Sequence, residues 1–162
     1  MREAEFERLY AEHARPLLAF LVYRTGDRAL AEDLVADTFE RVLTARRGFD
    51  RRRAGEKTWL YSIALNLVRD RVRRVDAGRR ALDRAYAGNV EPLDRDPFDA
   101  VDDRDAVQRA LGRLSPEERE TVSLRYGADL TVPEIAKLTG SKPTTIEGRL
   151  YRSLRKLRDA LG

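Results

Sequence analysis

Residues 131–158 read TVPEIAKLTGSKPTTIEGRLYRSLRKLR, and they contain the strongest helix signals in the chain. Thr131, followed three residues later by Glu134, has the pattern of a capping box, so a short helix should begin there. Gly140 is placed to end that helix, and Ser141 is the expected cap of a second one. The second helix carries its apolar residues at helical spacing, as Ile146, Leu150, Leu154, Leu157 and Leu161. Two helices joined by a tight glycine turn form the outline of a helix-turn-helix, whose second helix reads DNA in the major groove.

The second helix of this unit has side chains suited to both parts of a DNA contact. Long cations neutralise phosphates without reading sequence, whereas side chains near the helix start can meet base edges. A solvated charged face is the alternative interpretation, but the preceding glycine turn favours DNA binding. The predicted duplex-contacting set is Lys142, Thr144, Thr145, Glu147, Gly148, Arg149, Arg152, Arg155 and Lys156.

Helical spacing extends over nearly the whole chain, and no five-residue stretch alternates between apolar and polar residues. In the first half we expect helices over about residues 3–24, 28–43 and 59–72. Pro16 should kink or split the first of them, because proline lacks the amide proton that a helix interior needs. A second capping box at Ser115 should begin another helix. The sequence therefore predicts an all-α protein.

Composition excludes several classes of protein. The chain has 162 residues, 37% charged and 42% hydrophobic, too polar for a membrane protein and too apolar for a wholly disordered one. It has no cysteine, which excludes disulfides, thiol catalysis and thiolate zinc sites. Acidic residues near the start stand where a secretory signal would be apolar, so we expect a cytoplasmic protein without membrane insertion.

Charge divides the chain into three parts. Residues 1–75 hold 16 basic and 12 acidic side chains, residues 76–105 hold 5 and 9, and residues 106–162 hold 11 and 7. The middle part also contains glycines and prolines and has no apparent helical period, as in a flexible tether. We therefore predict two small helical domains, 1–75 and 106–162, joined by a flexible acidic linker, 76–105.

A basic loop separates the second and third predicted helices. Residues 46–59 contain six cations and two aromatic rings, a composition suited to single-stranded nucleic acid. Cations follow the phosphate backbone, while rings or a pocket receive unstacked bases. Trp59 also falls on the apolar stripe of the third helix, so packing is its main expected role.

An acidic face on the second predicted helix is the candidate protein-docking surface. Asp33 and Asp37 are four residues apart, yet two carboxylates without other ligands are weak support for a metal site. His13 is the only histidine, and it has no partner at metal-ligand spacing. Neither a glycine-rich phosphate loop nor a nucleophile elbow is present in the sequence. We expect neither an enzyme nor a cofactor or metal.

Three blocks in order resemble bacterial sigma factors of the extracytoplasmic-function (ECF) type. Residues 31–39, AEDLVADTF, resemble the family's helix that docks on RNA polymerase. Residues 59–66, WLYSIALN, are similar to its promoter-melting helix, and residues 111–152 resemble its region four. The resemblance covers nearly the whole chain.

The resemblance implies a sigma factor that binds core RNA polymerase and directs promoter-specific transcription initiation. The first domain would bind the polymerase through Asp33, Leu34, Asp37 and Glu40. It would melt the minus-ten promoter element with Arg51, Arg52, Arg53, Lys57, Trp59, Tyr61 and Asn66. The second domain would read the minus-thirty-five element, and an anti-sigma factor is a possible partner. The alternative is a stand-alone helix-turn-helix regulator whose first domain dimerises.

The chain departs from the usual family pattern in three places, Ala36-Asp37, Glu56 and Glu147-Gly148. Glutamate accepts hydrogen bonds from cytosine and repels phosphate, so Glu147 predicts a promoter preference different from the family's usual one. Because the chain ends soon after region four, we expect no regulatory extension beyond it.

Overall fold

The computed structural model describes residues 2–50, 52–53, 55–85 and 103–162. Every regular element among them is helical, which confirms the predicted all-α class. In chain order the elements are α1 (Glu3–Thr25), α2 (Arg28–Ala45), the 3-10 turn η1 (Arg46–Gly48), α3 (Glu56–Ala85), α4 (Asp103–Gly112), α5 (Pro116–Val122), the π-helical turn η2 (Ser123–Gly127), α6 (Val132–Thr139) and α7 (Pro143–Leu161).

Local chemistry sets most of the helix boundaries where the sequence predicts them. Asp27 caps α2, and its carboxylate accepts a hydrogen bond from a backbone amide in the first turn. Ser115 and Thr131 begin α5 and α6 with complete capping boxes. Gly26 and Gly140 end α1 and α6 in the left-handed region, with φ of 71° and 69°. Glycine adopts these angles without steric cost, so each helix stops sharply.

Three boundaries differ from prediction. Pro16 does not split α1, which continues unbroken because the residues around it are packed in the core. Lys142, rather than Ser141, is the N-cap of α7, and its side chain makes no capping hydrogen bond. The largest difference is in α3, which continues to Ala85 through ten residues predicted to be linker. Arginine and alanine are good helix formers, and they outweigh Gly78 in this exposed stretch. The linker prediction for residues 86–102 lies outside the described residues.

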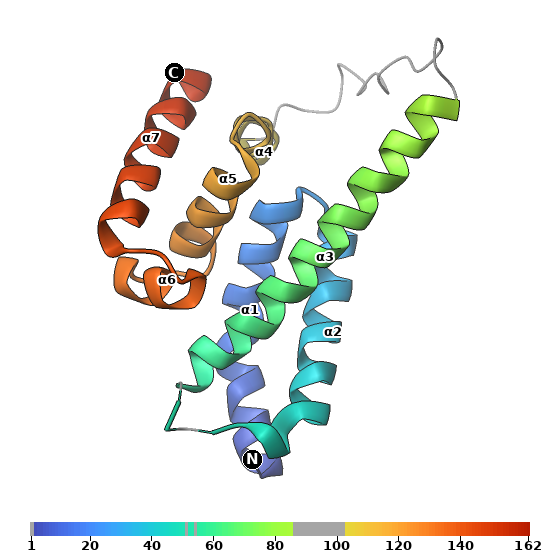
Figure 1. Cartoon of the computed structure of the whole chain (residues 1–162), viewed down its shortest axis with the longest axis vertical. Helices are drawn as coiled ribbons and strands as arrows, with labels where there is room; N and C mark the ends of the chain where they lie inside the picture. The colour runs from blue at the N-terminus through green and yellow to red at the C-terminus, as the bar shows by residue number, and fades with distance from the viewer. Residues whose placement is uncertain (1, 51, 54, 86–102) are drawn as a thin grey trace.

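Two groups of helices form two domains (Figure 1). Helices α1, α2 and α3 pack together, and α4 to α7 with η2 form the second group. The first group buries apolar side chains at helical spacing, among them Leu9, Leu17, Leu21, Leu34, Val42, Leu60 and Val68. The second group does the same with Leu111, Val122, Leu124, Ile135 and Ile146. In the stripe predicted for the last helix, Ile146 and Leu150 are buried, whereas Leu154 and Leu161 are exposed.

The two domains are in direct contact and share one continuous apolar cluster. Helix α1 lies against η2 along the boundary. A Cβ atom at Gly127 would lie 2.8 Å from the Cα of Phe20, so the backbones meet only because Gly127 has no side chain. Arg119 of α5 also donates from Nε to the backbone carbonyl of Tyr23, at 2.8 Å. The sequence predicts the two domains but not this closed arrangement.

Candidate nucleic-acid interfaces

Helices α6 and α7 form the predicted helix-turn-helix. Ile135 and Ala136 of α6 and Ile146 of α7 are buried where the two helices pack together. The left-handed Gly140 reverses the chain between them. With its apolar side fixed in this way, α7 leaves its first turns open to solvent. The exposed side chains there are Lys142, Thr144, Thr145 and Glu147.

Arg152 and Arg155 extend this exposed surface along α7. Neither forms an ion pair with another residue that the structure describes. Gly148 adjoins them, and a Cβ atom there would lie 3.2 Å from Nη1 of Arg152. The glycine therefore leaves room for the Arg152 guanidinium beside the helix. These two arginines have the accessibility that phosphate binding requires.

The other two cations predicted to bind DNA contact side chains of α5, although Lys156 remains exposed. Arg149 donates from Nη1 to the Thr121 hydroxyl at 3.4 Å, and its Nη2 lies 3.8 Å from a Glu117 carboxylate oxygen. Its side chain is only 19% exposed. Lys156 donates to Glu118 at 2.7 Å, and this hydrogen bond lowers the pKa of the Glu118 carboxyl. Arg149 and Lys156 thus hold α7 against α5, and their contact with DNA stays a prediction.

The basic loop before α3 is organised around two stacked rings. Phe49 and Trp59 have their ring centroids 4.6 Å apart and inclined by 30°. Trp59 is half-buried against the core, in agreement with its predicted packing role. Arg52 and Arg53 are exposed in the same loop, whereas Arg51 lies outside the described residues. The described part of the loop therefore contains both exposed cations and an aromatic pair.

Tyr61 does not belong to this surface. It is 1% exposed and packs against Phe20, with ring centroids 6.0 Å apart. Burial raises the pKa of its hydroxyl, which has no hydrogen-bond partner. The sequence missed this because Tyr61 stands one residue after Leu60, on the side of α3 that faces α1. The predicted DNA contact by Tyr61 is wrong for the arrangement described.

Two other residues predicted to melt DNA have different surroundings. Asn66 is exposed, two helical turns along α3 from Trp59. Lys57 is only partly exposed, because its Nζ lies 3.4 Å from a carboxylate oxygen of Glu134 on α6. Glu56 also faces away from the loop tip and accepts hydrogen bonds from Arg8 at 2.9 and 3.1 Å. In this arrangement the helix-turn-helix domain engages Lys57.

The residues of the predicted docking face on α2 differ in exposure. Asp33 and Glu40 are exposed and open to a partner. Asp37 is half-buried and lies 3.6 Å from Nη2 of Arg71. Leu34 is 2% exposed, so its side chain stabilises the helix from within and does not meet a partner. This corrects the prediction of direct contact by Leu34.

Sequence reasoning missed an apolar groove beside this acidic face. The groove has a volume of about 400 Å³ and lies between α1 and α2. Tyr10 lines it and is 50% exposed. The residues around the groove are Tyr10, Ala14, Arg15, Leu18, Glu32, Val35 and Ala36.

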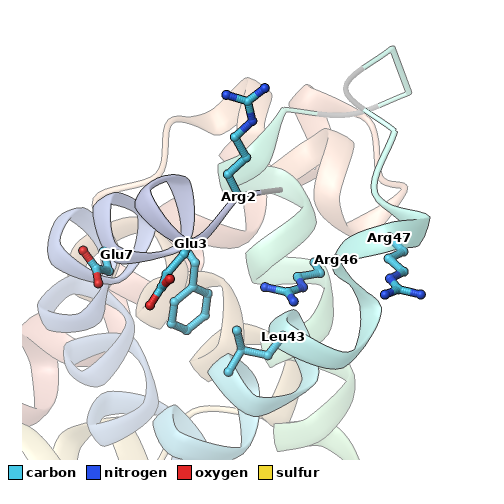
Figure 2. A pocket seen from close by; sticks show the side chains of 7 residues that line it. Arg2, Glu3, Glu7, Leu43, Arg46 and Arg47 are labelled. Carbon is cyan, nitrogen blue, oxygen red and sulfur yellow. The ribbon is translucent and has the colours of Figure 1, made fainter.

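A larger open cavity of about 810 Å³ adjoins the basic loop. Figure 2 shows Leu43 and Arg46 on its α2 and η1 side, and Glu3 on the α1 side. Phe6 and Glu7 also line it, so apolar, cationic and acidic side chains meet in one opening. The apolar part of this lining suits a planar base. The sequence indicated the loop but not the contribution of α1.

An ion pair and hydrogen bonds hold the two domains together. Arg69 of α3 binds Glu120 of α5 through two hydrogen bonds, each 2.8 Å long. Glu120 is buried, and this bidentate pairing raises the pKa of the Arg69 guanidinium. Together with the Lys57–Glu134 pair, it fixes α3 against the helix-turn-helix domain.

Other kinds of site are not apparent in the described part of the chain. No cluster of three or more histidine, cysteine, aspartate or glutamate side chains there is arranged to hold a metal ion. Among the helices described, none is both long and apolar enough to span a bilayer.

Comparison with known families agrees with the geometry. The model of Sigma-70 region 2 matches residues 9–78, and that of Sigma-70 region 4 matches residues 104–157. The first match contains the acidic helix and the basic loop, and the second contains the helix-turn-helix.

Curated relatives are similar over most of this chain. The RNA polymerase sigma factor CarQ of Myxococcus xanthus is 36% identical, with coverage of 97% of this chain and 89% of its own. The ECF RNA polymerase sigma factor BldN of Streptomyces coelicolor is 32% identical over 94% of this chain, which spans 58% of that longer relative. Mycobacterium tuberculosis SigL is 29% identical, with 93% and 85% covered.

Solved structures show the same fold. The sigma factor RpoE from Bartonella quintana, in complex with the anti-sigma factor NepR, superposes with a TM-score of 0.74 at 24% identity, covering 97% of this chain and 96% of that one. CnrH, in complex with the cytosolic domain of CnrY, gives 0.66 at 25% identity, covering 99% and 89%.

Proposed function

The chain belongs to the ECF sigma factors of bacterial RNA polymerase, and we propose how its two domains divide the work of promoter-specific initiation. One observation carries the proposal. A surface suited to single-stranded DNA lies in the first domain and a surface suited to duplex DNA lies in the second, in the order of sigma regions 2 and 4. The same order disfavours a stand-alone regulator, for which a region-2 domain has no use.

The second domain would recognise the upstream promoter element as duplex. Lys142, Thr144, Thr145 and Glu147 stand at the exposed start of α7, the part of a recognition helix that reaches base edges. Arg152 and Arg155 would bind flanking phosphates. Because Glu147 repels phosphate and favours cytosine, it would select sequence rather than add affinity.

The first domain would open the downstream element and hold a single strand. Arg52 and Arg53 would follow its backbone, and the cavity at Arg46 would receive an unstacked base. Asn66 would add a polar contact two turns away. Lys57 would join this set only after it leaves Glu134, so strand binding and the closed arrangement exclude one another at that residue.

Core polymerase would dock on α2 and the neighbouring groove. Asp33 and Glu40 supply exposed negative charge, and Tyr10, Leu18 and Val35 supply apolar area beside it. An interface that combines an apolar centre with a charged rim is typical of specific protein contacts. In such an interface the carboxylates would orient the polymerase and speed its association, and the apolar groove would supply most of the binding affinity.

The protein would act without catalysis of its own, since the polymerase supplies the chemistry. Its site of action would be the cytoplasm, where polymerase and chromosome are found. An anti-sigma factor is an expected partner, because the solved relatives RpoE and CnrH are complexes with NepR and with the cytosolic domain of CnrY.

Reconstitution tests the proposal directly. The purified chain is mixed with core polymerase, passed over a sizing column, and assayed for transcripts from a genomic promoter library. We expect co-elution and transcripts that share upstream and downstream elements. Failure to co-elute, or a specific footprint on duplex DNA without polymerase, would overturn the proposal.

A further inference from the structure

A basic hollow lies where the two domains meet, away from both candidate DNA surfaces. It consists of two adjoining cavities of about 210 and 700 Å³ that share Thr25, Arg79 and Arg119. The end of α1, the start of α2 and the middle of α3 line one side. Helices α4 and α5 line the other, so the hollow exists only while the domains are closed.

Arg24 is the deepest charge in the hollow. It is 9% exposed, and its Nε has no hydrogen-bond partner. Glu120 is the carboxylate with most influence on it, but both oxygens of Glu120 are bound by Arg69. A buried guanidinium without a full set of partners is costly, so such groups are normally paired. Burial accordingly lowers the pKa of Arg24.

Arg119 holds a second guanidinium at the same place. Its Nε donates to the carbonyl of Tyr23 at 2.8 Å, and its Nη2 donates to Gln108 at 3.3 Å. Both partners are neutral and leave its charge uncompensated. Burial, and then the nearby charge of Arg24, lower the pKa of Arg119. The protein therefore keeps two like charges together in a sheltered position.

The rim adds further positive charge. Arg79 borders both cavities and Arg109 borders the larger one, whereas Arg28 on the same rim is paired with Glu32 at 3.1 Å. The walls hold two carboxylates, Asp27 and Asp76, against the four other arginines, so their net charge is positive. The smaller cavity also has an apolar wall, formed by Leu30, Val72, Val75, Leu114 and Pro116.

We propose that this hollow binds a diphosphate group, either as free pyrophosphate or as part of a nucleoside diphosphate. Guanidinium groups pair with phosphate oxygens in bidentate geometry, and two to four of them match the charge of a diphosphate. The apolar wall next to Arg24 and Arg79 would take the base of a nucleotide. Because both domains line the site, a bound diphosphate stabilises the closed arrangement by mass action.

Its effect on initiation rests on the proposed function, whereas binding itself does not. A diphosphate that binds only the closed arrangement would keep Lys57 paired with Glu134. It would therefore oppose the binding of single-stranded promoter DNA. The first experiment uses the chain alone, without polymerase or DNA, so that a failure of either idea is recognised separately.

Binding is measured by calorimetry and by the thermal midpoint of the whole chain. Pyrophosphate and a nucleoside diphosphate are compared with potassium chloride and sulfate at matched ionic strength. We expect the two diphosphates to raise the midpoint above both salts. A tighter Kd for the nucleotide assigns the apolar wall to the base, and equal Kd values assign the site to free pyrophosphate.

Matched variants locate the site. Arg79→Gln should weaken pyrophosphate binding about tenfold, the size expected from one charge-assisted phosphate contact. Arg80→Gln, on the same exposed stretch of α3 but outside the hollow, should leave it unchanged. Arg24→Met should abolish the ligand-induced rise while the free protein stays folded. If Arg24→Met does not fold, Arg109→Gln is measured in its place and should reduce the ligand-induced rise in the thermal midpoint.

Two results would overturn the proposal. One is a diphosphate response no larger than that to sulfate. The other is an equal loss of binding in Arg79→Gln and Arg80→Gln, which would indicate general attraction to a basic chain.

Discussion

Replacing Gly127 by alanine should separate the two domains without unfolding either. The added Cβ would lie 2.8 Å from the Cα and 2.9 Å from the N of Phe20, about 0.6 Å inside ordinary contact at 3.4 Å. Both neighbours are backbone atoms of α1, so no side chain can rotate away. The backbone of Gly127 itself does not have a positive φ, so alanine is tolerated locally. The clash is therefore confined to the domain boundary.

The size of the effect follows from overpacking. Forcing a methyl group into a closed contact costs about 1–3 kcal/mol, which shifts the ratio of closed to open molecules roughly 5- to 150-fold. Glycine to alanine gains up to about 1 kcal/mol through the unfolded chain at a compatible position. The two terms act on different equilibria, so domain contact weakens while each domain keeps its stability.

Spin labels can measure this opening, because the chain has no cysteine of its own. Cysteines replacing Ala11 on α1 and Tyr151 on α7, both exposed, place one label on each domain. We expect a narrow distance distribution in the parent and a broad, longer one in Gly127→Ala. Gly112→Ala is the matched control, since a Cβ there meets nothing within 4 Å. Identical distributions in Gly127→Ala and the parent would refute the reasoning.

Three further predictions concern the docking face on α2, the cations of α7 and the carboxyl group of Glu118. Asp33→Arg should reduce co-elution with core polymerase while the unfolding midpoint stays unchanged, whereas Leu34→Ala should lower stability by about 2–5 kcal/mol in urea unfolding. When duplex promoter binding is measured at several salt concentrations, Arg152→Ala should lower the slope of log K against log salt concentration by about one. Arg149→Ala should chiefly lower the stability of the fold. The pKa of Glu118 is lowered on folding, so its stabilisation is present above the unfolded carboxyl pKa and is lost as pH falls through the folded value. Urea unfolding from pH 7 to 3 should show this acid loss, and Glu118→Gln should reduce it.

The helix boundaries could be predicted because their causes are local. Ser115 and Thr131 carry complete capping patterns within four residues, and Gly140 supplies the left-handed turn. Such signals act over a single turn, so a sequence contains all that they need. Pro16 and the linker part of α3 were predicted wrongly because a local breaker was given more weight than its surroundings. In α1 the surroundings are tertiary packing, and in α3 they are a run of good helix formers.

The candidate site could be predicted only in part, because it depends on which side of a helix faces the protein. Arg149 and Lys156 are one heptad apart and lie beside the buried stripe of α7, whereas Arg152 and Arg155 lie across the helix from it. Helical spacing places these two pairs on different sides of α7. It does not show that acidic residues of α5 lie next to Arg149 and Lys156. Tyr61 was misassigned for the same reason, since only the position of α1 makes its side of α3 internal.

In the closed arrangement, cations near the domain boundary are paired with carboxylates of the other domain. Lys57 is bound to a carboxylate of the helix-turn-helix domain, while Arg69 reaches across to Glu120 from the same helix. In a chain this basic, internal carboxylates and nucleic acid phosphates are alternative partners for the same cations. Ion pairs at the half-exposed Lys57 are weak, so phosphates of promoter DNA can replace Glu134 at small cost. The buried Glu120 cannot lose Arg69 so easily, because its charge would then be stranded. Opening separates α3 from α5 and so must break this pair, which adds to the packing at Gly127 as a barrier to separation of the two domains.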